Sequence, residues 1–291
     1  MTSANTTPLF SQEYETFLQQ LDKSPLTVQA YAADIRQFLT YLSATDVTIT
    51  KPDQVTRSLI SEYLASLAAQ GRTGTTRARK LISLQVFFQH LVHEHRIPHS
   101  PAATISRPKA IRRSHHFLRP EEYTRLLAEA GAHVRDFAIL QVFLQTGIRV
   151  SELIAICRDD LDMDHKELRI HGKGEKERVI PLEKKAMQAL KSYLSIRPEC
   201  VDTHVFLSYQ GKGFSIRGVR KLVEKYLKQA GITKQISCHG LRRTCLSTKA
   251  ARNMNAFAIQ ALAGHARMET TKLYVQLGTE DLRPLMEATS L

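Results

Sequence analysis

Apolar residues recur with the period of an α-helix along most of this sequence, and this pattern constrains the fold more than any other feature. The first third contains four such stretches, which start near Phe10, Ser24, Leu59 and Leu81 and are joined by short connections. Within each stretch the apolar side chains lie three or four positions apart and therefore share one helix face. Four short amphipathic helices predict a small helical bundle over residues 1–96.

The composition changes between residues 97 and 116. This stretch, IPHSPAATISRPKAIRRSHH, holds three prolines, scattered serines and a run of bases, and its apolar period is lost. Proline density without periodicity predicts a linker. Its bases, among them Arg107 and Lys109, would suit a segment that lies along a phosphate backbone. A solvated charge run is the equal alternative.

Residues 117–291 form a second domain with a mostly helical pattern. Two β-rich segments, Leu168–His171 and Arg178–Leu182, flank a Gly-Lys-Gly turn and predict one hairpin. The predicted fold class is mainly α: a four-helix bundle, then a mixed, mostly helical domain with a small antiparallel sheet. In this second domain, helical patterns cover residues 120–130, 134–146, 150–157, 183–196, 214–229, 239–252, 255–263, 268–275 and 279–287.

The charge of the chain points to a polyanionic partner. Lys and Arg number 41 against 28 Asp and Glu, a formal net charge of +13 among 291 residues. Nucleic acid is the first candidate partner and an anionic membrane surface is the second. No stretch reaches the ~18 apolar residues that span a bilayer. The N-terminus also lacks the basic start and apolar run of a signal peptide, so we expect a cytoplasmic protein.

The four cysteines favour neither a zinc site nor a disulfide framework. They lack paired C-x-x-C spacing and are expected to be reduced thiols. Cys238 or Cys245, on either side of His239, could act as a nucleophile, although buried structural thiols are the favoured interpretation. The segment HLVHEH is not the H-E-x-x-H motif, so no metal site is predicted.

Three clusters in the second domain carry residues that suit phosphate chemistry. Arg149 follows a glycine and opens a helix, where it could bind an anion; a surface ion pair with Glu152 is the alternative. Lys173 lies in the hairpin turn, whose default interpretation is an exposed β-turn. His239 and Arg242 are three residues apart and would share a helix face. Walker A and G-x-S-x-G motifs are absent.

Together these clusters resemble the tyrosine recombinase family, also called the phage integrase family, and most closely its two-domain Xer-like members. The segments TGIRVSEL, GKGEKERVIPL, HGLRRT and LAGHARMETTKLY occur in the order and at the approximate spacing of the family. The resemblance covers nearly the whole chain, and its first domain is similar to the DNA-clamping domain of the family. One departure is Arg243, where many relatives carry histidine, and this position is outside the core catalytic set.

The resemblance implies how the phosphate is held. Arg149 and Arg242 would bind the non-bridging oxygens of the scissile phosphate, and His265 would also bind it. Two guanidinium groups fit these oxygens bidentately and offset the negative charge that repels a nucleophile. Their stabilisation would increase as charge develops in the transition state.

The resemblance also implies how protons move. Tyr274 would be the nucleophile, and His239 would assist the transfer of its proton, because a tyrosine with a pKa near 10 is mostly neutral at pH 7. Lys173 would protonate the leaving 5′ oxygen. The phosphotyrosyl bond keeps the energy of the phosphodiester, so rejoining needs no ATP and no cofactor.

Basic residues at the start of the fourth helix, in the linker and on the helix near residues 214–229 are candidates for DNA contacts. A solvated helix face is the alternative for both helices. The predicted DNA-binding residues are Arg72, Arg77, Arg79, Lys80, Arg107, Lys109, Arg217, Arg220 and Lys221.

The implied function is site-specific recombination of double-stranded DNA in a tetramer, formed by identical chains or with a paralogue. The last predicted helix, Glu280–Ala288, would dock on the next protomer of a closed ring, or else pack on its own domain. About nine residues precede the first helix, so an arm-binding module is not expected, which favours resolution of DNA dimers or of a mobile element. The alternatives are a DNA-binding protein with little cleavage activity and a type IB topoisomerase.

Overall fold

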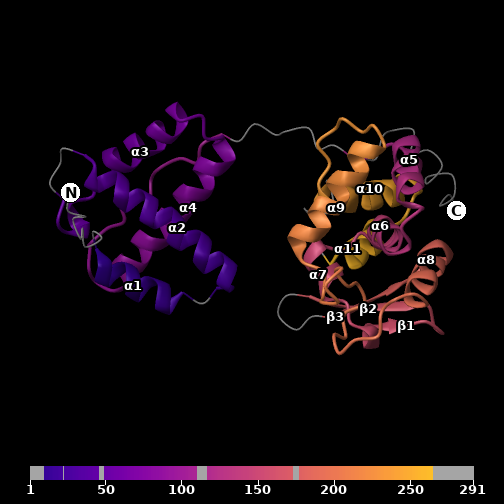
Figure 1. The fold of residues 1–291 in the computed structure, drawn as a ribbon. Coiled ribbons are helices and arrows are strands. Elements are labelled where there is room, and N and C mark those ends of the chain that lie inside the picture. Colours follow the sequence, from indigo (N-terminus) through magenta and orange to yellow (C-terminus); the bar gives the residue numbers. More distant parts are fainter. Residues whose placement is uncertain (1–9, 22, 46–48, 110–116, 173–176, 265–291) are drawn as a thin grey trace, which may run out of the picture. The chain divides into compact units, whose positions relative to one another are not determined.

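The chain divides into two compact units, residues 1–113 and 114–291 (Figure 1). The computed structural model describes residues 10–21, 23–45, 49–109, 117–172 and 177–264. Within these ranges, no helix is both long enough and apolar enough to cross a membrane. The predicted fold class is confirmed: both units are built mainly from helices, and the second carries one small antiparallel sheet.

The four predicted helices of the first unit are all present. The last of them, α4, packs against each of the other three and forms the centre of the bundle. Threonine side chains cap two of the helices: Thr56 accepts a hydrogen bond from the Leu59 amide, and Thr73 accepts one from the Thr76 amide, both at 3.3 Å. The helices are α1 (Ser11–Gln20), α2 (Pro25–Ser43), α3 (Arg57–Ala69) and α4 (Gly74–His93), with a 3₁₀ turn, η1 (Pro52–Gln54).

A buried carboxylate joins α2 to α4. Asp34 is only 2% exposed and accepts hydrogen bonds from Lys80 and Ser83, both at 2.8 Å, and a two-pronged contact from Arg79. A buried charge needs such partners because burial removes its hydration. Lys80 is consequently 7% exposed, with its ammonium group turned into the bundle. This burial counts against Lys80 as a DNA contact.

The first part of the predicted linker packs onto the bundle. Ile97 and Ala102 are buried in the apolar core of the first unit, and Ile105 is partly buried against it. The Gln85 side-chain amide donates a hydrogen bond to the Ala102 carbonyl at 3.2 Å. Arg107 and Lys109 are exposed beyond this anchored stretch. The proline density correctly indicated that this segment forms no helix. The segment nevertheless makes tertiary contacts with the bundle.

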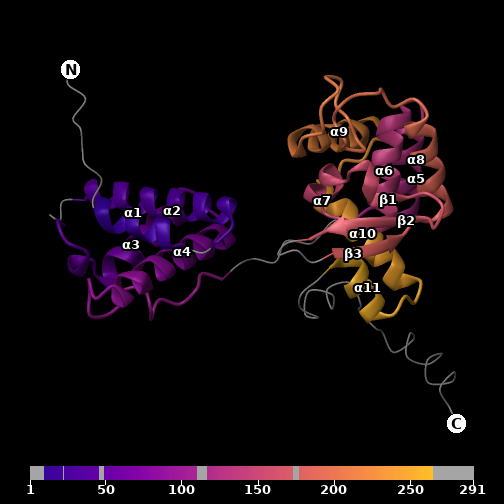
Figure 2. The same cartoon turned by 90° about the horizontal axis from the view of Figure 1, so that it is seen from below.

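The second unit places helices on one side of a three-stranded sheet (Figures 1 and 2). The sequence pattern predicted two of the strands. The third strand, β1, pairs with β2. It has only two residues, which are too few to show an alternating pattern in the sequence. The elements are α5 (Pro120–Ala130), α6 (Val134–Thr146), α7 (Val150–Ala155), η2 (Arg158–Asp160), β1 (Leu161–Asp162), β2 (Glu167–His171), β3 (Glu177–Pro181), α8 (Lys184–Leu194), α9 (Ile216–Gln229), α10 (Cys238–Ala251) and α11 (Ala256–Ala263).

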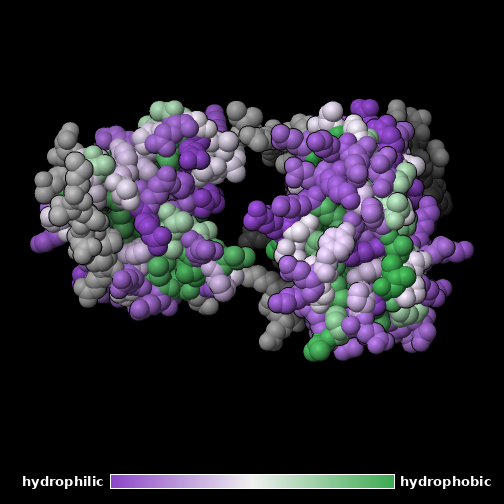
Figure 3. Space-filling view, in the orientation of Figure 1, coloured by the Kyte–Doolittle hydropathy of each residue, from purple (hydrophilic) through white to green (hydrophobic). Residues whose placement is uncertain are grey.

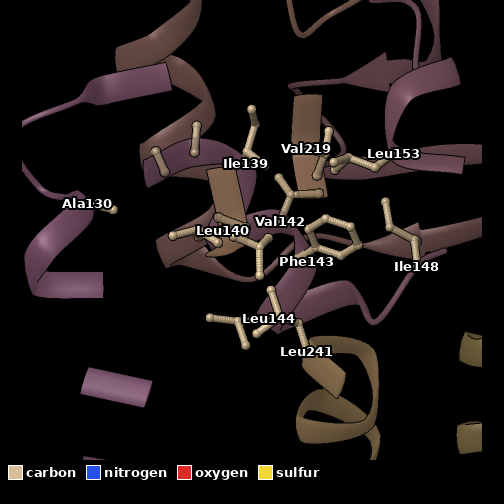
Figure 4. Packing of buried hydrophobic residues seen from close by; sticks show 14 of the residues in the cluster. Ala130, Ile139, Leu140, Val142, Phe143, Leu144, Ile148, Leu153, Val219 and Leu241 are labelled. Atoms are coloured by element: carbon tan, nitrogen blue, oxygen red, sulfur yellow. The ribbon is translucent and has the colours of Figure 1, made fainter. Parts of the chain in front are cut away.

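Helix α6 is the core of the second unit. Its residues from Ala138 to Thr146 are all buried, and α6 packs against α5, α8 and α10. A helix that is buried on every side is expected when other helices surround it. Phe143 lies among Val142, Ile148 and Leu153 in this cluster (Figure 4).

A buried hydrogen bond fastens the start of this unit to Thr244, whose hydroxyl is in turn bonded within α10. The Leu118 amide donates to the Thr244 hydroxyl at 2.9 Å, and this hydroxyl donates to the Gly240 carbonyl at 2.9 Å. Both Leu118 and Thr244 are buried. The two last predicted helices, residues 268–275 and 279–287, lie outside the described residues, as does the turn of the hairpin at residues 173–176.

Replacing Asp34 by alanine is expected to destabilise the bundle by about 3–5 kcal/mol, because the buried ammonium of Lys80 then loses its counter-ion. Hydrogen exchange of the α2 and α4 amides measures this loss for the first unit alone. The exposed Asp53→Ala is the matched control and should change protection by less than about 0.5 kcal/mol. Equal protection in both variants would show that Asp34 does not hold the bundle.

Candidate active site

Gly147 sets the position at which Arg149 enters the site. It ends α6 with φ of 62°, a left-handed conformation that favours glycine. A Cβ at this position would lie 3.1 Å from the Cys245 sulfur on α10, so the close packing of the two helices also requires glycine. The chain then turns, and Arg149 becomes the N-terminal cap residue of α7.

Arg149 is held by the carboxylate of Glu152. The Arg149 Nη1 atom lies 2.7 Å from Glu152 Oε1, and the Arg149 amide donates to Glu152 Oε2 at 2.7 Å. The ion pair considered from the sequence is therefore present. Because 43% of the Arg149 side chain is still exposed, the ion pair leaves this guanidinium open to a further ligand. Its Nη2 atom also donates to the Gly264 carbonyl at 3.2 Å.

Arg242 reaches the same place from α10 and is only 2% exposed. It donates to the Gly147 carbonyl at 2.8 Å and to the Ala263 carbonyl at 2.7 Å. The first bond ties Arg242 to the turn that precedes Arg149. The structure thus brings together the two arginines that the sequence predicted to act on one phosphate.

A third arginine, Arg178 on β3, completes the cluster. Its guanidinium grips Glu152 with two bonds, Nη1 to Oε1 at 3.1 Å and Nη2 to Oε2 at 2.8 Å. Its Nε atom donates to the Leu262 carbonyl at 3.1 Å. Sequence reasoning named Arg178 only as part of the hairpin. The missed signal was alternation: Arg178 is two residues before the buried Ile180 and so faces inward, where an arginine requires partners.

The last turn of α11 is where these side chains meet. The carbonyl groups of residues 262–264 accept hydrogen bonds from Arg178, Arg242 and Arg149 in that order. The final carbonyls of a helix lack partners within the helix and carry partial negative charge, so cations are favoured there. Gly264 closes the helix with φ of 62° and lies directly before His265.

Glu152 remains ionised in this cationic cluster. Burial alone would raise the pKa of this carboxyl group, but hydrogen bonds from Arg178 and Arg149 outweigh burial and lower the pKa below its usual value. A depressed pKa means that the ion pairs stabilise the fold above about pH 4.5. This contribution is lost as the pH falls through the lower folded-state pKa.

His171 fastens the base of the hairpin that contains Lys173. It lies 2.7 Å from Asp160 on η2 and 3.0 Å from Glu177, its register partner on β3. The hydrogen bond and charge of Asp160, and then those of Glu177, raise the pKa of His171. The contacts of the charged form are therefore complete below about pH 6.5 and are lost as the pH rises through the raised pKa.

Half of the predicted catalytic set lies in the described part of the chain. Arg149 and Arg242 meet at α11, and His239 is exposed on α10, three residues before Arg242. The other three predicted residues, Lys173, His265 and Tyr274, lie outside the described residues.

The predicted DNA contacts other than Lys80 reach the surface to different degrees. Arg72 is exposed, Arg77 is partly buried, and Arg79 keeps 48% of its side chain exposed while it binds Asp34. On α9, where the surface is largely hydrophilic (Figure 3), the three predicted contacts Arg217, Arg220 and Lys221 are all exposed.

The alternative of a cysteine nucleophile is not supported. Cys238 and Cys245 are both buried, as the favoured interpretation predicted. Burial raises the pKa of the Cys238 thiol, and it raises the pKa of Cys245 to about 12. A thiol with a raised pKa supplies little thiolate at neutral pH. Among the described residues, no group of three or more His, Cys, Asp or Glu side chains could hold a metal ion.

Family models match both units of the chain. The model of the phage integrase family matches residues 116–280, and the model of the phage integrase N-terminal SAM-like domain matches residues 12–95. The chain belongs to the phage integrase family. The arginine cluster thus lies in the part of the chain that matches the integrase model itself.

Individual relatives cover most of this family member. Tyrosine recombinase XerC of Thermodesulfovibrio yellowstonii is 34% identical, over 93% of this chain and 90% of the relative. Tyrosine recombinase XerD of Listeria innocua is 32% identical, over 86% and 88%. The solved structure of the Tn1549 transposon integrase, in complex with a circular intermediate DNA, has a TM-score of 0.80 at 19% identity and covers 96% of this chain and 98% of its own. This last likeness is one of fold.

Gly264→Ala is expected to disturb the arginine cluster. Gly264 and Gly211 both have positive φ, so alanine at either position costs about 1–2 kcal/mol of backbone strain. Only at Gly264 would the new Cβ crowd a neighbour, the Arg178 guanidinium at 3.0 Å, whereas Gly211 has nothing within 4 Å. Urea unfolding of the full chain should show a loss at least about 1 kcal/mol larger for Gly264→Ala than for Gly211→Ala. Equal losses of unfolding free energy in the two variants would mean that the Arg178 side chain moves away from the new Cβ at no cost.

Proposed function

We propose that this chain is a site-specific DNA recombinase that cleaves a strand by attack of Tyr274 on a phosphate, forms a 3′-phosphotyrosyl bond and rejoins the strand without ATP. The observation that carries the proposal is the convergence of Arg149 and Arg242 on consecutive carbonyls at the end of α11. Membership of the phage integrase family and the likeness to tyrosine recombinases support the same reaction.

Arg149 and Arg242 are suited to bind the phosphate at which one DNA strand is cleaved and another is joined. They present guanidinium donors from two different elements to one place, and a buried arginine gains more from an anion than an exposed one because water screens it less. Since the donors are already oriented, little reorganisation is needed as negative charge develops in the transition state. We assign to Arg149 and Arg242 the non-bridging oxygens of the scissile phosphate.

The remaining roles concern protons and the nucleophile. We assign Tyr274 as the nucleophile, His239 to assist transfer of its proton, and His265 to bind the phosphate. Lys173 protonates the leaving 5′ oxygen, which is a poor leaving group without a proton. Two positions support these assignments: His239 is exposed on the helix of Arg242, and His265 follows Gly264 directly.

The basic surface serves binding of the recombination site. We propose that residues 1–96 clamp the duplex, residues 97–116 link the domains and residues 117–291 catalyse strand exchange in the cytoplasm, on the nucleoid. Phosphate contacts of this kind position the protein and weaken with salt. The relatives named tyrosine recombinase XerC and XerD support recombination, and we propose that it serves resolution of DNA dimers or of a mobile element.

Tyr274→Phe is expected to abolish a covalent protein–DNA adduct, because the variant lacks the attacking oxygen. Nicked suicide substrates that carry candidate sites are incubated with each protein and resolved on denaturing gels. The matched control is Tyr209→Phe, at an exposed tyrosine of the same unit, which should trap DNA as the wild type does. An adduct that persists in Tyr274→Phe would refute this nucleophile.

Two other outcomes of the trapping experiment decide between functions. Site binding by the wild type without any adduct would indicate a DNA-binding protein of this fold. Relaxation of supercoiled plasmids that lack the site would indicate a type IB topoisomerase.

Removal of residues 279–291 is expected to weaken tetramers on DNA while binding to a single site survives. We propose that this segment docks on the next protomer of a cyclic tetramer, formed by identical chains or together with a paralogue. Native gels with one-site and two-site DNA measure the two steps separately. Unchanged synapsis after the deletion would show that the segment packs on its own unit.

A further inference from the structure

Arg178 is an arginine on the inward face of a strand. It pairs with Ile170 across β2 and β3, shares its face with the buried Ile180, and keeps only 15% of its side chain exposed. Burial of a guanidinium is costly unless its charge is paired and its donors are used. The function proposed above gives Arg178 no role, although it is among the least exposed cations of the cluster.

Arg178 and Arg149 share Glu152 unequally. Arg178 donates to both carboxylate oxygens of Glu152, at 3.1 and 2.8 Å. Its Nε atom donates a further hydrogen bond to the Leu262 carbonyl. Arg149 contacts Glu152 with one side-chain nitrogen, at 2.7 Å, and is 43% exposed against 15% for Arg178. Arg178 is therefore the enclosed partner of Glu152, and Arg149 is the partner that still faces solvent.

The charges of this trio explain why two arginines are needed. A carboxylate that orients a single arginine also cancels its charge, and the pair would then attract a phosphate only weakly. Two guanidinium groups on one carboxylate, Arg149 and Arg178 on Glu152, leave a net charge of +1. This positive charge is available at Arg149, because Arg149 is the more exposed of the two arginines.

We propose that Arg178 is a positioning residue for strand cleavage: it is the dedicated counter-ion of Glu152, so that this carboxylate orients Arg149 without neutralising the charge with which Arg149 binds the scissile phosphate. The inference rests on the function proposed above. Arg178 acts through Glu152 and Arg149 and does not touch the DNA.

The inference predicts a rescue that a purely structural role would not produce. In Arg178→Met, Glu152 is left to Arg149 alone, and the rate of adduct formation on a suicide substrate should fall by about 100-fold, as for loss of one oriented donor. In the double variant Arg178→Met, Glu152→Gln, the cancelling charge is gone, and the rate should rise by about tenfold above that of Arg178→Met. The rescue stays partial because the bond to the Leu262 carbonyl is not restored.

Arg178→Lys tests the same idea with a variant that keeps the charge. It retains the counter-ion of Glu152 but not the planar fork, so its rate should fall by about tenfold only. All variants should bind the target site within about threefold of the wild type, because the loss is in the reaction rather than in binding. The matched control is Arg169→Met, an exposed arginine on the outward face of β2, which should cleave at the wild-type rate.

The outcomes separate this inference from the proposed function. No adduct from the wild type would overturn both. An adduct from the wild type together with normal cleavage by Arg178→Met would overturn the inference alone. A double variant that cleaves no faster than Arg178→Met would also overturn it, because the two residues would then act only as parts of the scaffold.

Discussion

Three arginines from separate parts of the chain bind the last carbonyl groups of one helix, and the geometry of the candidate site depends on this arrangement. Residues 262–264 offer three consecutive acceptors, and each is taken by a side chain from β3, α10 or the turn before α7. A helix end supplies partial negative charge without a side chain that could itself titrate. The segment that follows α11, where His265 begins, therefore starts from a point that is fixed on three sides.

The arrangement of helices was predictable because it depends on a repeated signal. Each helix carries several apolar residues at a spacing of three or four, so one misplaced residue does not hide the pattern. Strand β1 has two residues and no such redundancy. The anchoring of Ile97 and Ala102 was missed for a similar reason, because isolated apolar residues between prolines form no period.

The candidate site was predictable only in part, because partners in it come from distant positions. Short motifs and the family resemblance singled out Arg149 and Arg242, but nothing local shows that Arg178 shares Glu152 with Arg149 across 26 residues of chain. Lys80 illustrates the opposite error. Its place near the start of a basic helix suggested DNA, whereas a carboxylate 46 residues away draws it into the bundle. A sequence shows which charged residues lie near the start of a helix, but it does not show which distant residue forms an ion pair with them.

The bond between Leu118 and Thr244 ties the start of the second unit to the helix that carries Arg242. Leu118 is close to where the chain enters this unit, and Thr244 is two residues after Arg242 on the same helix. The start of the unit is therefore anchored to α10 within one helical turn of an arginine of the candidate site, so a change at either point bears directly on the other.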